Sequence, residues 1–273
     1  MIPLLAERFP RPTVVGIVNV TPDSFSGDGV LDPGDAAEQA RRMVADGAGL
    51  VDVGAESTRP GSTAVAADEE LARVAPVLEA VAAELAVSID TSKAAVARRA
   101  LELGAVMVND VTALRGDPDL AAVVVESEAY LCLMHMRGEP RTMQDDPRYD
   151  DVVAEVARFL EERLAFAVSA GIPEDRICLD PGIGFGKTVE HNLELLARLD
   201  ELVALGRPVM IGASRKRFLG RVLGDPDAVT GPVAASVATS VLAYQRGASL
   251  FRVHDVREHV EALGAARAVE AAL

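Results

Sequence analysis

The chain has 273 residues, enough to bury a large core as one big α/β domain or two small ones. Nearly half of the residues are apolar and a quarter are charged, which is ordinary for a globular protein and argues against a disordered one. The formal net charge is −15 and no basic stripe is present, which argues against nonspecific binding to nucleic acid. An anionic substrate would therefore need Lys or Arg placed locally at its site.

The N-terminal stretch MIPLLAERFPRP lacks the basic and apolar regions of a signal peptide, and no apolar run has the length of a membrane span. Cys132 and Cys178 each lie in an apolar run, outside any CxxC pattern, so we expect two reduced core residues. These features predict a cytoplasmic protein that does not bind membranes.

Eight short apolar, β-branched runs recur along the chain, and each predicts a buried strand. They span residues 13–20, 49–55, 86–91, 106–111, 130–136, 176–182, 208–213 and 250–255. Amphipathic helices are predicted between them, over 35–48, 68–85, 93–105, 119–129, 150–171, 191–206 and 232–248, with a last helix from about 256.

Near-continuous apolar strands that alternate with helices predict a parallel sheet covered by helices. Eight such units over this length favour a (β/α)8 TIM barrel, an α/β fold, as a single domain over residues 1–273. A Rossmann fold would need GxGxxG after the first strand, where VNVTPDSFS stands. Two segments, 21–34 and 137–149, are long enough to be lids or binding loops.

Polar side chains stand near the end of every predicted strand, where such a barrel places its active site. A single Asp or Asn there is more often a helix cap, but eight strands that each deliver a polar residue to one rim favour a binding site. Carboxylates and carboxamides suit a flat heterocycle, and the cationic donors suit an oxyanion or a phosphate. In chain order the residues are Asn19, Asp52, Glu56, Asp90, Asn109, Asp110, His135, Asp180, Ser214, Arg215, Lys216, Arg252 and His254.

Other site chemistries find less support. No Cys or His cluster has metal-ligand spacing and no GxSxG elbow is present, although Mg²⁺ held by one protein oxygen and a substrate phosphate stays open. His191 and His259 fall on predicted helices, where we expect surface residues. The GFGKT stretch is not a phosphate loop, because Pro181 stands where GxxxxGK[ST] requires glycine and lacks an N–H for a phosphate.

Eight motifs in one order, which together cover nearly the whole chain, resemble the dihydropteroate synthase family. They are GIVNVTPDSFS, VDVGAESTRPG, SIDTSK, VNDV, LMHMRGEPRTMQDDPRYDD, LDPGIGFGK, GASRKRFLG and RVHDV. That family joins 6-hydroxymethyl-7,8-dihydropterin diphosphate to 4-aminobenzoate in folate biosynthesis and releases pyrophosphate. The resemblance implies an Mg²⁺-dependent transferase, a homodimer formed through the later helices, and inhibition by sulfonamides, which mimic 4-aminobenzoate.

The resemblance also implies roles for individual residues, with Asp90, Lys216, Arg252 and His254 as the catalytic set. Asn19 would bind Mg²⁺ with the diphosphate, which Thr58, Arg252 and His254 would contact. The pterin would be held by Asp90, Asn109, Met134, Asp180 and Lys216, with Asp52 and Gly212 in support. Arg59, Pro60, Phe185, Ser214 and Arg217 would surround 4-aminobenzoate, and Thr21, Asp23, Ser24, Phe25 and Ser57 would belong to mobile loops that close over the centre.

In the family, pyrophosphate leaves first and the arylamine attacks a cationic pterin methylene, so no covalent nucleophile is implied. The chain departs from the family pattern at two places. It reads SFSGDG where the family usually reads SFSDGG, in a loop one residue shorter, and Arg217 stands where some members have Ser near the arylamine carboxylate. A helix N-terminus at Arg217 could still bind that carboxylate.

Two other functions stay open. A methyltransferase that passes a methyl group from methyltetrahydrofolate to a corrinoid protein would share the Asp and Asn residues around the pterin, but would not need the TPDSFS, ESTRPG, SRK and RVH motifs. A non-catalytic paralogue would be expected to have lost loop residues such as Asp23, Thr58 and Arg59, which are all in place.

Overall fold

The computed structural model describes residues 2–21, 29–57 and 64–272. Eight strands form one parallel sheet in the order β6-β5-β4-β3-β2-β1-β8-β7, and an isolated bridge between Leu179 and Val209 joins its two edges. The strands are β1 (Thr13–Asn19), β2 (Leu50–Gly54), β3 (Val87–Asp90), β4 (Met107–Asp110), β5 (Tyr130–Met134), β6 (Ile177–Asp180), β7 (Met210–Ile211) and β8 (Leu250–Val253). The predicted (β/α)8 barrel is confirmed.

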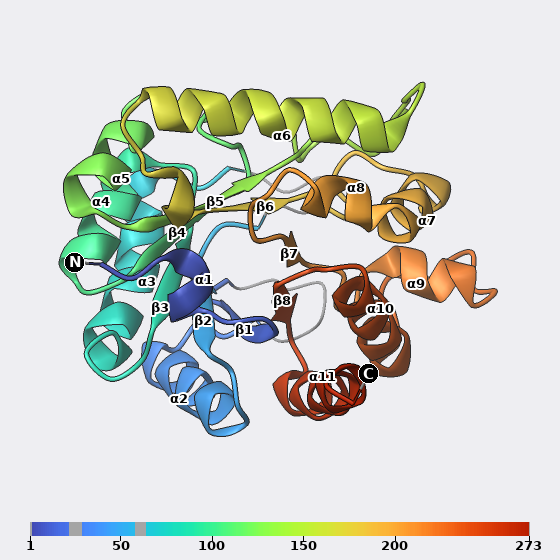
Figure 1. Cartoon of the computed structure of the whole chain (residues 1–273). Coiled ribbons are helices and arrows are strands. Elements are labelled where there is room, and N and C mark those ends of the chain that lie inside the picture. Colours follow the sequence, from blue (N-terminus) through green and yellow to red (C-terminus); the bar gives the residue numbers. More distant parts are fainter. Residues whose placement is uncertain (1, 22–28, 58–63, 273) are drawn as a thin grey trace.

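Helices surround the strands on the outside (Figure 1). They are α1 (Leu5–Arg8), α2 (Pro33–Ala45), α3 (Ala67–Val81), α4 (Ala94–Glu102), α5 (Leu120–Ser127), α6 (Val152–Ser169), α7 (Val189–Ala197), α8 (Leu199–Val203), α9 (Arg217–Val222), α10 (Val233–Gln245) and α11 (Val256–Glu270), with a short 3₁₀ turn at Glu174–Arg176. Each predicted helix is present, but the predicted helix 191–206 is two helices, and the short helices α1 and α9 were not predicted.

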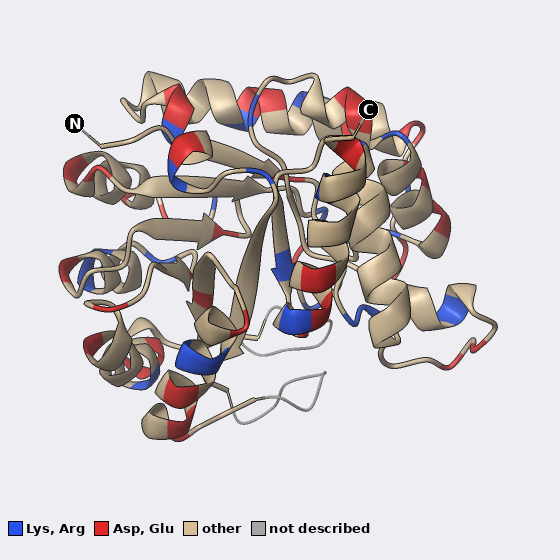
Figure 2. Ribbon diagram, turned by 60° about the horizontal axis from the view of Figure 1, so that its bottom comes forward, with Lys and Arg blue, Asp and Glu red and all other residues tan. Residues whose placement is uncertain are grey.

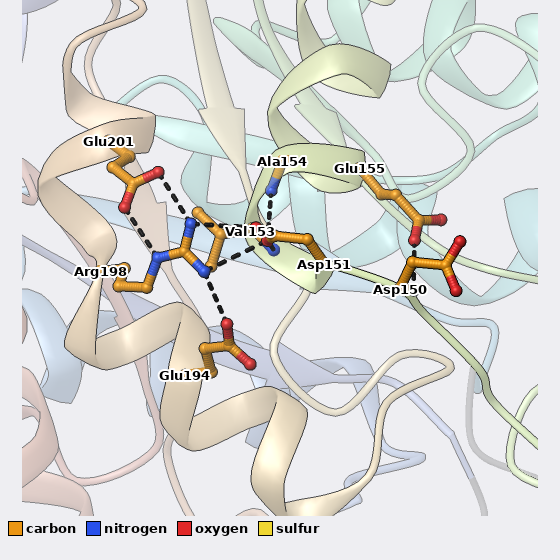
Figure 3. A network of polar contacts seen from close by, with 8 residues as sticks. All are labelled: Asp150, Asp151, Val153, Ala154, Glu155, Glu194, Arg198 and Glu201. Carbon is orange, nitrogen blue, oxygen red and sulfur yellow. Dashed lines mark hydrogen bonds and ion pairs between the residues drawn. The ribbon is translucent and has the colours of Figure 1, made fainter.

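The break between α7 and α8 lies at Arg198, whose guanidinium binds three carboxylates (Figure 3). Nη1 lies 2.6 Å from Glu194 of α7 and 3.2 Å from Asp151, and Nε lies 2.7 Å from Glu201 of α8. Asp151 is the N-cap of α6 and also accepts hydrogen bonds from Val153 N and Ala154 N. One side chain therefore links three helices on the outside of the barrel.

The amino-terminal end of the barrel is filled with apolar side chains. Val15, Leu50, Met107 and Tyr130, near the starts of four strands, share a buried cluster with Leu5 and Phe9 at either end of α1. Both cysteines belong to this cluster, buried and unpaired, so their expected place in the core is confirmed. Because this end is closed, only the carboxyl ends of the strands are left to form a site.

The helix surfaces correct one expectation about histidine. His259 on α11 is fully buried, not exposed, and its Nδ1 lies 2.6 Å from the carbonyl oxygen of Asp255. His191 is half-buried, because it caps α7 through Thr188 and its ring lies 4.9 Å from that of Tyr149. The error has a simple cause, since the packing partner of a helix face is not visible in the sequence of that helix.

Lys and Arg are scattered among Asp and Glu over the outer helices (Figure 2). Within the described ranges, no helix combines the length and the apolar character that crossing a bilayer requires.

Candidate active site

A cavity of about 720 Å³ opens at the carboxyl ends of the strands. Its wall draws on strands β1, β3 and β8 and on the loops that follow β6 and β7. Many of the residues that the sequence assigned to the site line it together. These are Asn19, Thr21, Glu56, Ser57, Asp90, Phe185, Gly212, Ser214, Lys216, Arg217, Arg252 and His254.

One side of the cavity rests on a chain of charged hydrogen bonds that crosses four strands. Arg252 Nε donates to Asp52 at 2.6 Å, and Arg252 Nη2 donates to Asp90 at 2.8 Å. The amide of Asn109 donates to the same Asp52 oxygen at 2.9 Å. The other oxygen of Asp52 is buried and has no hydrogen-bond partner among the residues that the structure describes. Strand pairing places Asp90 opposite Asn109, whereas Asp52 pairs with Ser88, two residues before Asp90.

This array changes the proton affinity of its members. Burial raises the pKa of Asp90 to about 7, Arg252 opposes the rise, and Asp52 adds to it. Burial acts to lower the pKa of Arg252, but the two carboxylates outweigh it and hold the pKa above its usual value. Arg252 is therefore a fixed cation that faces the cavity between two acids, one of which titrates near neutral pH.

A second group of charged residues joins the loop after β6 to the loop after β7. Lys216 Nζ donates to the carbonyl of Ile183 and lies 4.4 Å from the centre of the Phe185 ring, a cation–π contact. Burial lowers the pKa of Lys216 to about 7, against the opposing effect of Asp180. Asp180 is itself buried, which raises its pKa, and its Oδ1 accepts a hydrogen bond from Gly182 N at 2.7 Å.

Ser214 and His254 form a pair in the cavity wall. The Ser214 hydroxyl lies 3.0 Å from His254 Nδ1 and accepts from the His254 backbone N–H at 3.2 Å. Next to them, the Arg215 side chain is ion-paired with Asp255, with Nε 2.9 Å from Oδ2. Arg215 has φ of 55°, so the chain turns sharply between Ser214 and Lys216 and both can face the cavity.

Four other predicted residues, Asp52, Asn109, Met134 and Asp180, are buried behind the wall. Met134 belongs to a small apolar cluster with Val111, Met136 and Met143, against which Phe185 packs. The Asp180 carboxylate approaches the cavity beside Gly212, where an added Cβ would lie 4.0 Å from Oδ2. Six predicted residues, namely Asp23, Ser24, Phe25, Thr58, Arg59 and Pro60, lie outside the described residues.

Three residues expected at the rim are used elsewhere, and one of them is Arg215, which is ion-paired with Asp255. Asp110 accepts hydrogen bonds from Thr112 and from Leu114 N within its own loop. His135 lines a second hollow, of about 290 Å³, and is not part of the wall of the large cavity. The site also contains Gln144, which the sequence did not indicate individually. Its amide donates to Gly184 O at 2.5 Å. In the sequence, the only indication of a role for Gln144 was the length of the loop 137–149 that contains it.

The residues present fit a magnesium ion bound largely by substrate. Among the described residues, no three His, Cys, Asp or Glu side chains gather as metal ligands. Mg²⁺ commonly takes one or two protein oxygens and completes its shell with water and phosphate oxygens. The Asn19 carboxamide, in the cavity wall at the end of β1, can supply one such oxygen.

Comparison with known proteins agrees with this geometry. The sequence model of the family described as pterin binding enzyme matches residues 15–254. The dihydropteroate synthase of Escherichia coli K12 is 46% identical over 269 residues, which cover 96% of this chain and 92% of that protein.

Two solved structures have the same fold. The dihydropteroate synthase of Yersinia pestis in a sulfonamide drug complex superimposes with a TM-score of 0.91 at 43% identity, covering 96% of this chain and 95% of that one. The Xanthomonas albilineans enzyme in complex with 7,8-dihydropteroate superimposes with a TM-score of 0.84 at 46% identity. The match covers 96% of this chain and 95% of that one. On this combination of family match, identity and coverage, the chain belongs to the dihydropteroate synthases, within the pterin-binding enzyme family.

Proposed function

We propose that the large cavity joins 6-hydroxymethyl-7,8-dihydropterin diphosphate to 4-aminobenzoate, giving 7,8-dihydropteroate and pyrophosphate. The observation that carries this proposal is the Asp52–Arg252–Asp90 array, in which Asp90 and the fixed cation of Arg252 line the cavity side by side and Asp52 holds Arg252 from behind. A pterin diphosphate needs both, because its ring has N–H donors and its leaving group is anionic. The relative from Xanthomonas albilineans was solved with the product of this reaction.

The pterin ring takes the side of the cavity where the buried acceptors lie. Asp180 and Asn109 offer an acceptor and an amide to its polar edge, and Asp90 offers a second carboxylate. Met134 lies beneath, in the cluster against which Phe185 packs. Lys216 approaches from the opposite loop and donates to ring acceptors. This division fits a flat molecule with alternating donors and acceptors.

The diphosphate lies toward Arg252 and His254, with Thr58 as a further contact and Asn19 as the protein ligand of Mg²⁺. When bound, Mg²⁺ neutralises charge on the phosphate oxygens. Arg252 keeps its charge throughout, since Asp52 and Asp90 hold its pKa above the usual value. A cation that needs no rearrangement is well suited to stabilise charge that grows on a leaving group.

The arylamine binds in the outer part, near Phe185, Ser214 and Arg217, and we propose the same role for Arg59 and Pro60. Arg217 is the first residue of α9 and lines the cavity, so its guanidinium can meet the carboxylate of 4-aminobenzoate. Sulfonamides would compete for this part of the site, and the relative from Yersinia pestis was solved with such a drug.

The reaction then proceeds by dissociation followed by attack. The methylene C–O bond breaks, its electron pair leaves with pyrophosphate, and the methylene becomes cationic. The arylamine nitrogen forms the new C–N bond with its lone pair and then loses a proton. Asp90 and Asp180 stabilise positive charge on the ring, and the loops that contain Thr21, Asp23, Ser24, Phe25 and Ser57 exclude water that would trap the cation.

We expect pure protein incubated with dihydropterin diphosphate, 4-aminobenzoate and Mg²⁺ to release pyrophosphate and dihydropteroate in equal amounts. A coupled pyrophosphate assay, with chromatography of the product, measures both. Omission of 4-aminobenzoate is the control for simple hydrolysis. No pyrophosphate release from protein that still binds 6-hydroxymethylpterin would favour a non-catalytic paralogue or a pterin-dependent methyltransferase instead.

The protein also presents an apolar surface that fits a homodimer through its later helices. Val222, Leu223 and Val229, at α9 and the segment after it, are large, apolar and exposed, and Leu242 of α10 is exposed as well. We expect light scattering to give twice the 28.7 kDa mass of the chain. Leu242→Glu should lower that mass toward one chain, whereas Leu4→Glu, at a similarly exposed apolar residue near the N-terminus, should not. A monomeric parent protein would contradict the proposal.

Residues 1–273 act as one catalytic domain. The protein works in the cytoplasm, a reducing compartment, which agrees with Cys132 and Cys178 remaining free thiols although they face each other on adjacent strands.

A further inference from the structure

Lys187 is a buried lysine in the loop between β6 and α7, with 3% of its surface exposed. Its Nζ lies 2.9 Å from Gly182 O, 3.0 Å from Phe185 O and 2.9 Å from His135 Nδ1. Burial lowers the pKa of Lys187 well below its usual value. The three acceptors match the three N–H donors that the protonated amine has. The group is thus committed to the protein rather than to a phosphate.

His135 is adapted to this contact. When Lys187 is protonated it can only donate, so His135 Nδ1 then accepts and the ring proton is on Nε2. The ring is held edge-on to Phe159 with 4.8 Å between centroids, so it cannot turn away freely. Burial and the nearby Lys187 also lower the pKa of His135 to about 2, so the imidazole stays neutral.

The loop that Lys187 braces is one that would otherwise have many conformations. Gly182, Gly184 and Gly186 all have positive φ, at 67°, 83° and 64°. No other residue fits at position 182, because an added Cβ would lie 1.9 Å from His135 O. Phe185 stands between two of these glycines, and its backbone carbonyl is one of the three acceptors of Lys187.

Phe185 is the residue through which this brace reaches the cavity. Its ring lines the cavity wall, with Lys216 Nζ 4.4 Å from the ring centre. A small shift of the Phe185 carbonyl would move the ring and change the width of the outer part of the cavity. Asp180 is less dependent on the brace, since it belongs to β6, whose ladder with β5 runs through Met134 and Asp180.

We propose that Lys187 is a positioning residue that, through the Phe185 backbone, sets the aromatic wall of the 4-aminobenzoate pocket. This rests on the proposed place of the arylamine beside Phe185. Lys187 also lines the cavity, but its Nζ is taken up by three acceptors of the protein, so we assign it no contact with the diphosphate or the pterin. It therefore determines arylamine affinity far more than pterin affinity, although it stands in the motif that also carries Asp180.

The test compares Lys187→Met, which keeps the length of the side chain and loses its three donors, with the parent protein. We expect the KM for 4-aminobenzoate to rise about tenfold or more, because misplacement of a positioning group costs at least that much. The kcat and the Kd for 6-hydroxymethylpterin should stay within about threefold. Lys187→Arg, which restores donors and charge, should recover part of the arylamine KM.

The matched control is Arg163→Met. Arg163 also donates to backbone carbonyls of a loop after a strand, at 2.7 Å to Ala113 O and 3.3 Å to Leu114 O, but on the loop after β4. The Arg163→Met substitution should lower the melting temperature and leave the KM for 4-aminobenzoate unchanged. If Lys187→Met does not fold, His135→Leu removes one acceptor of Lys187 and should shift the arylamine KM in the same direction by about threefold.

An unchanged KM for 4-aminobenzoate in an active, folded variant would overturn the proposal, as would an equal loss of pterin affinity. Failure of the proposed reaction would look different, because the parent itself would then release no pyrophosphate. In that case calorimetric titration of 4-aminobenzoate, with pyrophosphate and Mg²⁺ present, makes the same comparison between variants without turnover.

Discussion

Replacing Asp180 by alanine is expected to weaken binding of the pterin by about 2–3 kcal/mol, or roughly 30- to 150-fold in Kd. Asp180 is buried at the end of β6, and Gly182 N occupies one of its oxygens at 2.7 Å. The other oxygen lies beside Gly212, where the cavity begins. Without it, an N–H donor of the bound ring would lose its acceptor in a site closed to water. Calorimetric titration with 6-hydroxymethylpterin measures the change.

The control for Asp180→Ala is Asp110→Asn. Asp110 is also a buried carboxylate at the end of a strand, but Thr112 and Leu114 use its oxygens within the loop. Its replacement should reduce stability and leave the Kd for the pterin close to that of the parent. Equal affinity in Asp180→Ala and the parent would remove Asp180 from the pterin site.

The second large effect is expected from Arg252→Met. Removing the cation leaves Asp52 and Asp90 buried against each other, and breaking a buried ion pair in this way costs about 3–5 kcal/mol of unfolding free energy. Activity should fall by about 100-fold or more, since a charge aimed at the leaving group is lost. Urea unfolding and steady-state kinetics measure the two effects separately.

The loss of stability should depend on pH in one direction. Asp90 already has a pKa of about 7 with Arg252 opposing the rise, so its pKa in the variant is higher still. A carboxyl group with a raised pKa in the folded state contributes stability that is present at low pH and lost as pH rises through that pKa. The destabilisation should therefore be smaller near pH 5.5, where the lost ion pair with Asp52 is its main source, and grow from pH 7 to pH 8.5.

Arg257→Met is the matched control for this measurement. Arg257 is ion-paired with Asp46, but its side chain is 68% exposed. Such pairs contribute little, so the unfolding free energy should stay within about 1 kcal/mol of the parent at each pH. A destabilisation by Arg252→Met that is the same at pH 5.5 and pH 8.5 would contradict the role assigned to Asp90.

The strands and their order were predictable because each is a short run of buried apolar residues. The helix predicted over 191–206 was wrong in one respect, since Arg198 makes its ion pairs with Glu194, Glu201 and Asp151 only through a break that periodicity does not reveal. His259 was misplaced because its packing partner is distant in the sequence. Local sequence patterns predict whether a segment is a helix or a strand. Tertiary contacts determine which of its faces are buried.

For the site, the sequence predicted many of the described residues that line the cavity, was wrong about Asp110 and His135, and did not reveal how the charged residues pair. That Arg252 holds both Asp52 and Asp90 depends on the registry of four strands, which no local pattern encodes. Lys187 is the opposite case. Its Gly-Lys setting suggested a phosphate ligand, the proline at 181 argued against one, and the structure gives its ammonium three acceptors within the protein.

The short β7 strand has a mechanical consequence. Strand β7 has two residues, both paired with β8, and within the described part of the chain one isolated bridge, between Leu179 and Val209, joins it to β6. Asp180 and Phe185 follow one edge, and Ser214 and Lys216 follow the other. A substrate that touches both groups spans this seam, so part of its binding energy also holds the barrel shut. Bound substrate would therefore also stabilise the closed barrel.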